Sequence, residues 1–310
     1  MTELRFDGRT AIVTGAGGNP SLGRAHAMLL AARGANVVVN DIGSDPEMRH
    51  YPGTASSEAV AEEIRAAGGK AVADTNTVAT VEGAQAIVQT ALDAFGGIDI
   101  LVNNAAVSIA APFAAMTPHD FQRHIDINLM GAVWTTRAAW PHMLASGYGR
   151  IVNTTSSSMT GFAEQTAYAT SKGGLWSFTR SLAAEGAAHG IKVNAVSPGA
   201  FTRLVVSTLE DDSPLLEHSK ENLPPELASP ALAYLCHEDC PVNGECIDSV
   251  GGEVQRTYMG RTRGFADRAV TIEMVAQRWD EVMSQAGAET LGIGDMDTSG
   301  WKMRAYEGVE

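Results

Sequence analysis

The stretch TAIVTGAGGNPSLGRAHAMLLAARG, residues 10–34, passes from a short apolar run through a glycine-rich loop into a helical pattern. The run at 10–14 shows no polar alternation, which is typical of a strand covered on both faces of a parallel sheet. Apolar residues then recur at helical spacing over 22–33, and Gly34 follows as a C-cap. This strand–loop–helix unit predicts the first part of a βαβ repeat.

The same alternation continues along the chain. The predicted strands are 10–14, 36–40, 70–73, 98–103, 150–155, 191–196 and 244–250. The predicted helices between and after them are 22–33, 56–67, 81–95, 118–145, 167–189 and 226–236. We therefore expect a doubly wound α/β fold, with a seven-stranded parallel sheet and helices on both faces.

Two segments differ in composition from this repeat. Residues 203–230 carry acidic residues and prolines without a clear strand, which favours a lid over the carboxyl ends of the strands. Residues 259–310 follow the last strand as a C-terminal extension, with a helical pattern centred on 271–285. The sequence thus predicts one domain over 1–258, with 259–310 appended to it.

Composition limits the classes of function. Lysine and arginine number 22 against 36 aspartates and glutamates, and the net charge of −14 argues against a nucleic-acid partner. Three cysteines in a chain that is 45% hydrophobic indicate free thiols in a reducing compartment. No run approaches the ~18 apolar residues of a membrane span, so we expect a cytoplasmic protein with no membrane partner.

The glycine-rich loop after the first strand has the composition of a phosphate-binding turn. Glycines let the backbone approach a pyrophosphate, whose charge is met by N–H groups at the helix start. Asp41 ends the second strand, 26 residues beyond Gly15, where a carboxylate binds the adenosine ribose and repels a 2′-phosphate. Ile42 follows instead of arginine, so NAD is favoured over NADP. A plain β–α turn and a solvated carboxylate stay open as alternatives.

The segment YATSK places Tyr168 and Lys172 four residues apart in a helical pattern, so both project from one face. A phenol ionises near pH 10, and an ammonium one turn away favours the phenolate. Such a pair can move a proton to or from a carbonyl oxygen. Taken alone, the same spacing also fits an ordinary exposed helix face.

Five motifs in order along residues 5–255 resemble the short-chain dehydrogenase/reductase family. They are TGAGGNPSLG (14–23), NNAA (103–106), Ser156 after the fifth strand, Tyr168 with Lys172, and Pro198-Gly199. The resemblance implies a Rossmann fold and an NAD-dependent enzyme that interconverts a secondary alcohol and a ketone. Its implied catalytic residues are Asn128, Ser156, Tyr168 and Lys172. Its implied cofactor-binding residues are Gly15, Gly17, Ser21, Leu22, Gly23, Asp41, Asn76, Thr77, Asn104, Ala105, Ala106, Tyr168, Lys172, Pro198, Gly199 and Thr202.

The resemblance also implies a role for each catalytic residue. Tyr168 is the acid/base, Lys172 lowers its pKa and binds the nicotinamide ribose, and Ser156 hydrogen-bonds the substrate oxygen. Asn128 holds a proton-relay water. Since Ser156 stands 12 residues before Tyr168 where 13 is commoner, Thr155 or Ser157 could take its place.

The glycine-rich loop departs from the pattern of the family. It is two residues longer than TGxxxGxG, so Ser21 or Gly18 must replace the middle glycine. In the family, the two long helices, here 118–145 and 167–189, pair between subunits. The resemblance therefore implies a homodimer or homotetramer.

Several further segments resemble the dehydrogenase part of multifunctional β-oxidation enzymes, which oxidise D-3-hydroxyacyl-CoA. They are VVVNDIG (37–43), EEIRAAGGKAVAD (62–74), TRAAWPHM (136–143) and LCHEDCPVNGE (235–245). A hydroxysteroid or terpene alcohol as substrate stays open, as does a non-catalytic NAD-binding protein. We expect no metal site, because Cys236, His237, Cys240 and Cys246 lack zinc-site spacing. The acidic residues 210–212 are interpreted as a solvated lid edge.

Overall fold

The computed structural model describes residues 2–43, 56–208 and 213–294. Contacts divide the chain into two compact units, Met1–Arg256 and Thr257–Glu310. The acidic residues 210–212 lie outside the described residues.

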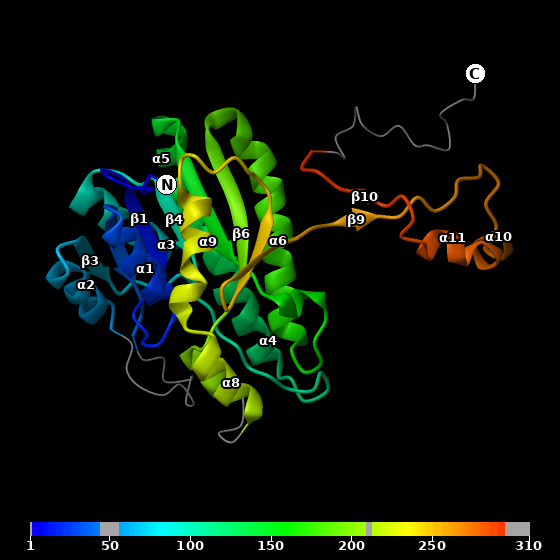
Figure 1. Ribbon diagram of the computed structural model, residues 1–310, viewed down its shortest axis with the longest axis horizontal. Coiled ribbons are helices and arrows are strands. Elements are labelled where there is room, and N and C mark those ends of the chain that lie inside the picture. Colours follow the sequence, from blue (N-terminus) through cyan, green and yellow to red (C-terminus); the bar gives the residue numbers. More distant parts are fainter. Residues whose placement is uncertain (1, 44–55, 209–212, 295–310) are drawn as a thin grey trace. The chain divides into compact units, whose positions relative to one another are not determined.

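The first unit is built on one eight-stranded sheet, ordered β3-β2-β1-β4-β5-β6-β7-β8 (Figure 1). Its strands are β1 (Thr10–Thr14), β2 (Asn36–Asn40), β3 (Lys70–Asp74), β4 (Ile100–Asn103), β5 (Gly149–Thr154), β6 (Ile191–Gly199), β7 (Cys246–Val250) and β8 (Glu253–Thr257). Neighbours from β3 to β7 pair in parallel. The seven expected strands and the doubly wound α/β fold are confirmed, and β8 adds an eighth strand.

The strand β8 had no apolar signal by which to predict it. It follows β7 after Gly251 and Gly252, which both have positive φ angles that favour glycine. Four of its five residues, EVQRT, are exposed. A strand that buries no side-chain face lacks the hydrophobic pattern that reveals its neighbours.

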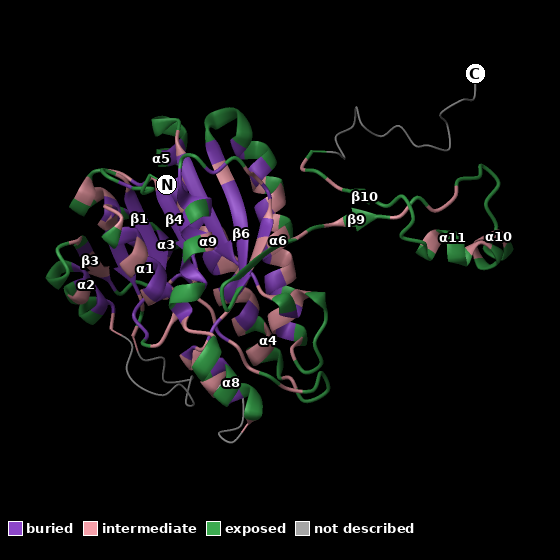
Figure 2. Cartoon of the chain, in the orientation of Figure 1, coloured by how far each residue is buried: buried purple, intermediate pink, exposed green. Residues whose placement is uncertain are grey.

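Helices cover both faces of the sheet. On one face α1 (Leu22–Ala32) packs against α2 (Ser57–Ala66) and α9 (Ser229–Cys236). On the other lie α3 (Val81–Phe95), α4 (Pro118–His124), α5 (Gly131–Ser146) and α6 (Thr166–Gly186). Figure 2 shows the strands between these layers as the buried centre of the unit. The central strand residues, such as Ile12, Val38 and Leu101, are fully buried.

One helix of the second face is interrupted. Between α4 and α5 the chain forms a π-helical segment, η1 (Ile125–Met130), with the sequence IDINLM. A π-helical turn carries an extra residue and is frequent at functional sites. This segment contains Asn128, which is buried.

The described residues of the expected lid segment form short helices. These are α7 (Arg203–Thr208), α8 (Pro214–Asn222) and the 3₁₀ turn Pro225–Leu227. Residues 257–294 of the second unit contain two short helices, α10 (Ile272–Gln277) and α11 (Trp279–Met283). It also has a two-stranded pair, β9 (Gly260–Arg261) with β10 (Glu289–Thr290).

Candidate active site

A cavity of about 450 Å³ opens at the carboxyl ends of the central strands. It lies where the strand order turns: the chain runs outward from β1 to β3, then returns to β4 on the other side of β1. Open α/β sheets bind ligands at such a point. The expected site residues that line this cavity are Gly15, Ser21, Leu22, Asp41, Thr77, Asn104, Ala105, Ala106, Ser156, Tyr168, Lys172, Pro198, Gly199 and Thr202. Gly17, Gly23, Asn76 and Asn128 are not part of the lining.

The glycine-rich loop is packed so closely that Gly15, Gly17 and Gly23 leave no room for a side chain. A Cβ on Gly15 would lie 2.7 Å from Cα of Ala105, and one on Gly23 would lie 2.3 Å from the carbonyl oxygen of Gly15. Ser21 caps α1 by accepting a hydrogen bond from the Arg24 N–H at 3.2 Å. The loop therefore presents bare backbone beside a capped helix start, which fits a dinucleotide diphosphate.

Asn104 braces this loop from the end of β4. Its Nδ2 donates to the carbonyl oxygens of Thr14 at 2.9 Å and Gly15 at 3.1 Å. Its backbone N–H donates to Oγ1 of Thr14 at 3.0 Å. The NNAA motif thus fixes the shape of the loop as well as the wall of the cavity.

Asp41 is held by backbone amides at both carboxylate oxygens. Oδ2 accepts from the Gly17 N–H at 2.8 Å and Oδ1 from the Gly43 N–H at 2.9 Å. Burial raises the pKa of this carboxyl, while the two N–H groups and the positive charge of Arg203 act in the opposite direction. Although no arginine follows Asp41 in the sequence, the fold brings one from α7 within electrostatic reach of it.

The two expected adenine-side residues have different environments. Thr77 lines the cavity, together with Val78. The side-chain amide of Asn76 donates to Oδ2 of Asp74 at 2.8 Å, and its backbone N–H donates to Oδ1 of the same residue. In this structure Asn76 therefore shapes the turn after β3.

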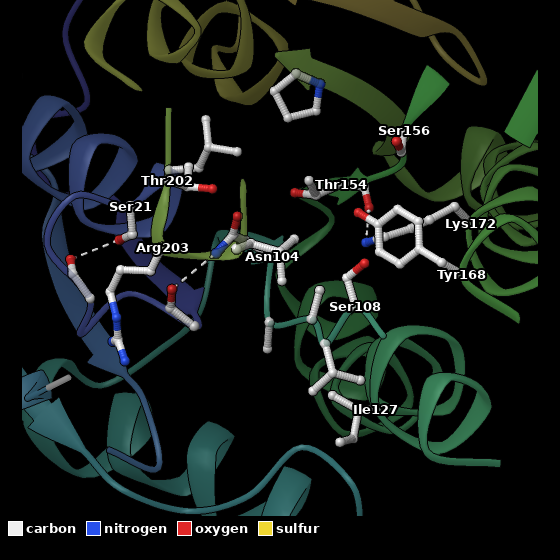
Figure 3. Close-up of a pocket in the computed structure, with 18 of the residues that line it drawn as sticks. Ser21, Asn104, Ser108, Ile127, Thr154, Ser156, Tyr168, Lys172, Thr202 and Arg203 are labelled. Atoms are coloured by element: carbon white, nitrogen blue, oxygen red, sulfur yellow. Dashed lines mark hydrogen bonds between the residues drawn. The ribbon is translucent and has the colours of Figure 1, made fainter. Parts of the chain in front are cut away.

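Tyr168 and Lys172 lie at the opposite end of the cavity from Ser21 and Arg203 (Figure 3). The Nζ atom of Lys172 lies 5.5 Å from the centre of the Tyr168 ring. It donates a hydrogen bond to the carbonyl oxygen of Thr154 at 2.7 Å. Burial lowers the pKa of Lys172 to about 7, so this ammonium can lose its proton near neutral pH.

The three candidates for the substrate-oxygen donor differ in their surroundings. Thr155 is buried and its Oγ1 donates to the carbonyl oxygen of Val196 at 3.0 Å. Ser157 is exposed and is not among the lining residues. Ser156 lines the cavity, and its Oγ accepts a long 3.2 Å hydrogen bond from the Ser158 N–H. Its hydroxyl proton can therefore be donated to a ligand, which favours Ser156 of the three.

Asn128 uses its whole side chain inside the protein. Its Oδ1 accepts from the Val107 N–H at 2.8 Å, and its Nδ2 donates to the Val107 carbonyl at 2.9 Å and to Oγ of Ser171 at 3.1 Å. These bonds tie the π-helical segment to the chain after β4 and to the residue before Lys172. Asn128 thus holds the side chain of Ser171, the neighbour of the lysine, against the chain after β4.

His124 is a buried neighbour of Tyr168 that sequence reasoning missed. The two rings meet edge to face, with centroids 6.2 Å apart. Nε2 accepts from the Ile109 N–H at 3.0 Å, and Nδ1 donates to the Asp120 carbonyl at 2.7 Å. Burial lowers the pKa of His124, which matches this neutral, fully bonded ring. No spacing in the sequence relates it to Tyr168.

The cavity has an apolar wall that the sequence did not reveal either. Its apolar side chains include Val107, Ile127, Phe162, Leu204 and Val205. They come from four separate segments, so only the fold brings them together. A ligand with a hydrocarbon part fits this wall better than a fully polar one.

Other candidate sites are weak. In the described part of the chain, no group of three or more His, Cys, Asp or Glu side chains could hold a metal ion. Cys236, Cys240 and Cys246 are buried free thiols, and burial raises the pKa of Cys246 to about 11. No helix among the described residues is long and apolar enough to cross a bilayer.

Comparisons with known proteins agree with this geometry. A family model described as short chain dehydrogenase matches residues 9–213. The chain is 40% identical over 299 residues to the peroxisomal multifunctional enzyme type 2 of Drosophila melanogaster, covering 94% of this chain and 48% of that protein. It therefore spans about half the length of this relative.

Two other relatives are covered over almost their whole length. The 3-oxoacyl-[acyl-carrier-protein] reductase of a Synechocystis species is 35% identical over 259 residues, covering 80% of this chain and 99% of that protein. The crystal structure of a short chain dehydrogenase from Mycobacterium avium has a TM-score of 0.75 at 34% identity. It covers 89% of this chain and 96% of that one.

Proposed function

The chain belongs to the short-chain dehydrogenase family. From this premise we propose that it is an oxidoreductase that interconverts a secondary alcohol and a ketone, and that it uses NAD to oxidise a 3-hydroxyacyl thioester. The observation that carries the proposal is one cavity with Tyr168, Lys172 and Ser156 at one end and the glycine-rich loop at the other.

The preference for NAD is supported by Asp41. The family generally binds nicotinamide dinucleotides, with or without a 2′-phosphate. Asp41 lines the cavity, and a 2′-phosphate beside its carboxylate would meet like charge. Asp41→Ala should therefore raise the KM for NAD and lower the KM for NADP, measured under the same conditions.

The catalytic residues act on the proton of the alcohol. A nicotinamide bound in this cavity would supply the hydride acceptor. Ser156 donates a hydrogen bond to the substrate oxygen, and Tyr168 takes the hydroxyl proton as charge develops on that oxygen. Lys172, whose pKa is near neutrality, favours the ionised phenol and passes the proton on. Asn128 donates to the hydroxyl of Ser171 and so positions the residue next to Lys172 for this relay.

The substrate class is supported by the relatives and by the apolar wall. The Synechocystis relative is named for a 3-oxoacyl group carried on a protein. The side chains of Val107, Ile127 and Phe162 give the cavity a surface for a hydrocarbon chain. The lid segment 203–230 would close over such a substrate.

The experiment is reduction of NAD with a panel of D- and L-3-hydroxyacyl-CoA thioesters, hydroxysteroids and terpene alcohols. Turnover of a D-3-hydroxyacyl-CoA that is lost in Tyr168→Phe, while NAD binding is retained, supports the proposal. If only another class of alcohol is turned over, the proposal that the substrate is a 3-hydroxyacyl thioester is rejected. Turnover that survives in Tyr168→Phe would reject the assigned acid/base.

We further propose a homodimer or homotetramer in the cytoplasm. The three buried free thiols fit a reducing compartment. The assembly would use the helices within 118–145 and 167–189, as the family resemblance implies. Sedimentation velocity of the purified protein measures the oligomeric state, and a monomer at micromolar concentration would contradict it.

A further inference from the structure

Arg203 joins the lid to the glycine-rich loop. It is the first residue of α7, and its backbone N–H donates to the Pro20 carbonyl at 3.3 Å. Its side chain lies against Gly18, where an added Cβ would be 3.3 Å from Nη1 and 3.4 Å from Cδ of the arginine. Figure 3 shows the side chain extending along the Ser21 side of the cavity, away from Tyr168.

Few charged side chains line the cavity, and Asp41 lies within electrostatic reach of Arg203. Among the described residues that line it, the cationic side chains are Lys172 and Arg203, at opposite ends. At the Arg203 end, the oxygens of Asp41 accept the N–H groups of Gly17 and Gly43. If a ligand spans the cavity and places two negative charges at the glycine-rich loop, those charges therefore meet the guanidinium of Arg203.

We propose that Arg203 is a ligand of the diphosphate of the cofactor and so fastens α7 over the glycine-rich loop when a dinucleotide is bound. This inference rests on the proposed use of a nicotinamide dinucleotide. A guanidinium presents a planar set of donors that bind phosphate oxygens in pairs, as an ammonium does not. The helix start at Ser21 supplies backbone N–H groups to the same anion.

The diphosphate suits this guanidinium better than a 2′-phosphate does. The side chain of Arg203 packs on Gly18, and the hydroxyl of Ser21, the cap of α1, donates to the Gly18 carbonyl at 2.8 Å. Arg203 thus lies at the loop that leads into the helix start. A 2′-phosphate would instead have to lie beside the Asp41 carboxylate, which repels it.

The experiment measures binding without turnover. Isothermal titration calorimetry gives the Kd of ADP-ribose and of 2′-phospho-ADP-ribose for wild type, Arg203→Gln and Arg203→Lys. Ligand-observed NMR gives the affinity for adenosine, which has no phosphate. Arg33→Gln removes the same charge from an arginine outside the cavity lining and is the matched control. Thermal unfolding of each variant checks that the fold is retained.

We expect Arg203→Gln to weaken ADP-ribose binding by about 10- to 100-fold, as for loss of a charge-assisted bidentate contact. Arg203→Lys should be intermediate, and adenosine binding and the Arg33→Gln control should be unchanged. Unaltered ADP-ribose binding in Arg203→Gln would overturn the proposal, as would a loss confined to 2′-phospho-ADP-ribose. A wild-type protein that binds ADP-ribose but oxidises no alcohol would contradict the proposed function. The role of Arg203 in binding the diphosphate would still stand if Arg203→Gln weakened that binding.

Discussion

Lys172→Met is expected to make the protein more stable while abolishing its turnover. Lys172 is 1% exposed, and burial lowers its pKa from 10.5 to about 7. A shift of ~3.5 units corresponds to about 5 kcal/mol between the charged and neutral forms. At pH 7 Lys172 is half protonated in the folded protein and fully protonated in the unfolded protein. The shifted pKa therefore lowers the free energy of unfolding at pH 7 by about 4 kcal/mol.

Part of that cost is offset in the wild type. The hydrogen bond from Nζ to the Thr154 carbonyl contributes about 1–3 kcal/mol, and methionine cannot make it. Methionine has a similar length and no charge to desolvate. Lys172→Met should therefore raise the free energy of unfolding at pH 7 by about 1–3 kcal/mol.

The pH dependence gives a sharper test. The folded pKa lies below the unfolded one, so the unfolded state binds more protons between pH 7 and 10.5 and stability rises with pH in that window. From pH 7 to 9 the free energy of unfolding of the wild type should rise by about 2 kcal/mol more than that of Lys172→Met. Urea unfolding at both pH values measures the difference, with Lys70→Met as a control at an exposed lysine. A variant less stable than wild type at pH 7, with the pH dependence unchanged, would refute the reasoning.

Two further substitutions test the loop and the core. Gly23→Ala should destabilise the protein by about 2–4 kcal/mol, because its Cβ would lie 2.3 Å from the Gly15 carbonyl oxygen. Gly97→Ala is the control in thermal unfolding, because no atom lies within 4 Å of a Cβ added there. An equal loss of stability in both variants would contradict the clash at Gly23. Burial lowers the pKa of His26 to about 3, so the folded histidine stays neutral while the unfolded one protonates below pH 6.5. Between pH 7.5 and 5 the free energy of unfolding of the wild type should fall by about 2 kcal/mol more than that of His26→Gln. The same dependence of stability on pH in both proteins would contradict the lowered pKa of His26.

The sequence predicted the sheet because each parallel strand is covered on both faces and so is almost wholly apolar. It missed β8 because that strand buries no side-chain face. The glycine-rich loop and the Tyr168–Lys172 pair were recognisable because each is a local pattern in the chain. The role of glycine in the loop is also local, since Gly15 and Gly23 are eight residues apart.

The other cavity residues depend on contacts between distant segments. His124 reaches Tyr168 only because α4 and α6 pack together. Arg203 reaches Gly18 only because α7 folds back over the first loop. No spacing along the chain encodes either approach. The apolar wall is assembled in the same way from four segments. Residues that act through such long-range packing need coordinates to be found.

The π-helical segment η1 sets the rotational phase of a long helix. α4, η1 and α5 follow one another without a break, and the extra residue of a π turn offsets the side chains before it from those after it. Removing one residue from 125–127 would restore regular winding but turn the part before the deletion by about 100° against the part after it. His124 and Asn128 could then no longer both face their partners, Ile109 and Val107. Apart from Asn128, the positions of this segment should therefore accept substitutions far more readily than a change in the length of the segment.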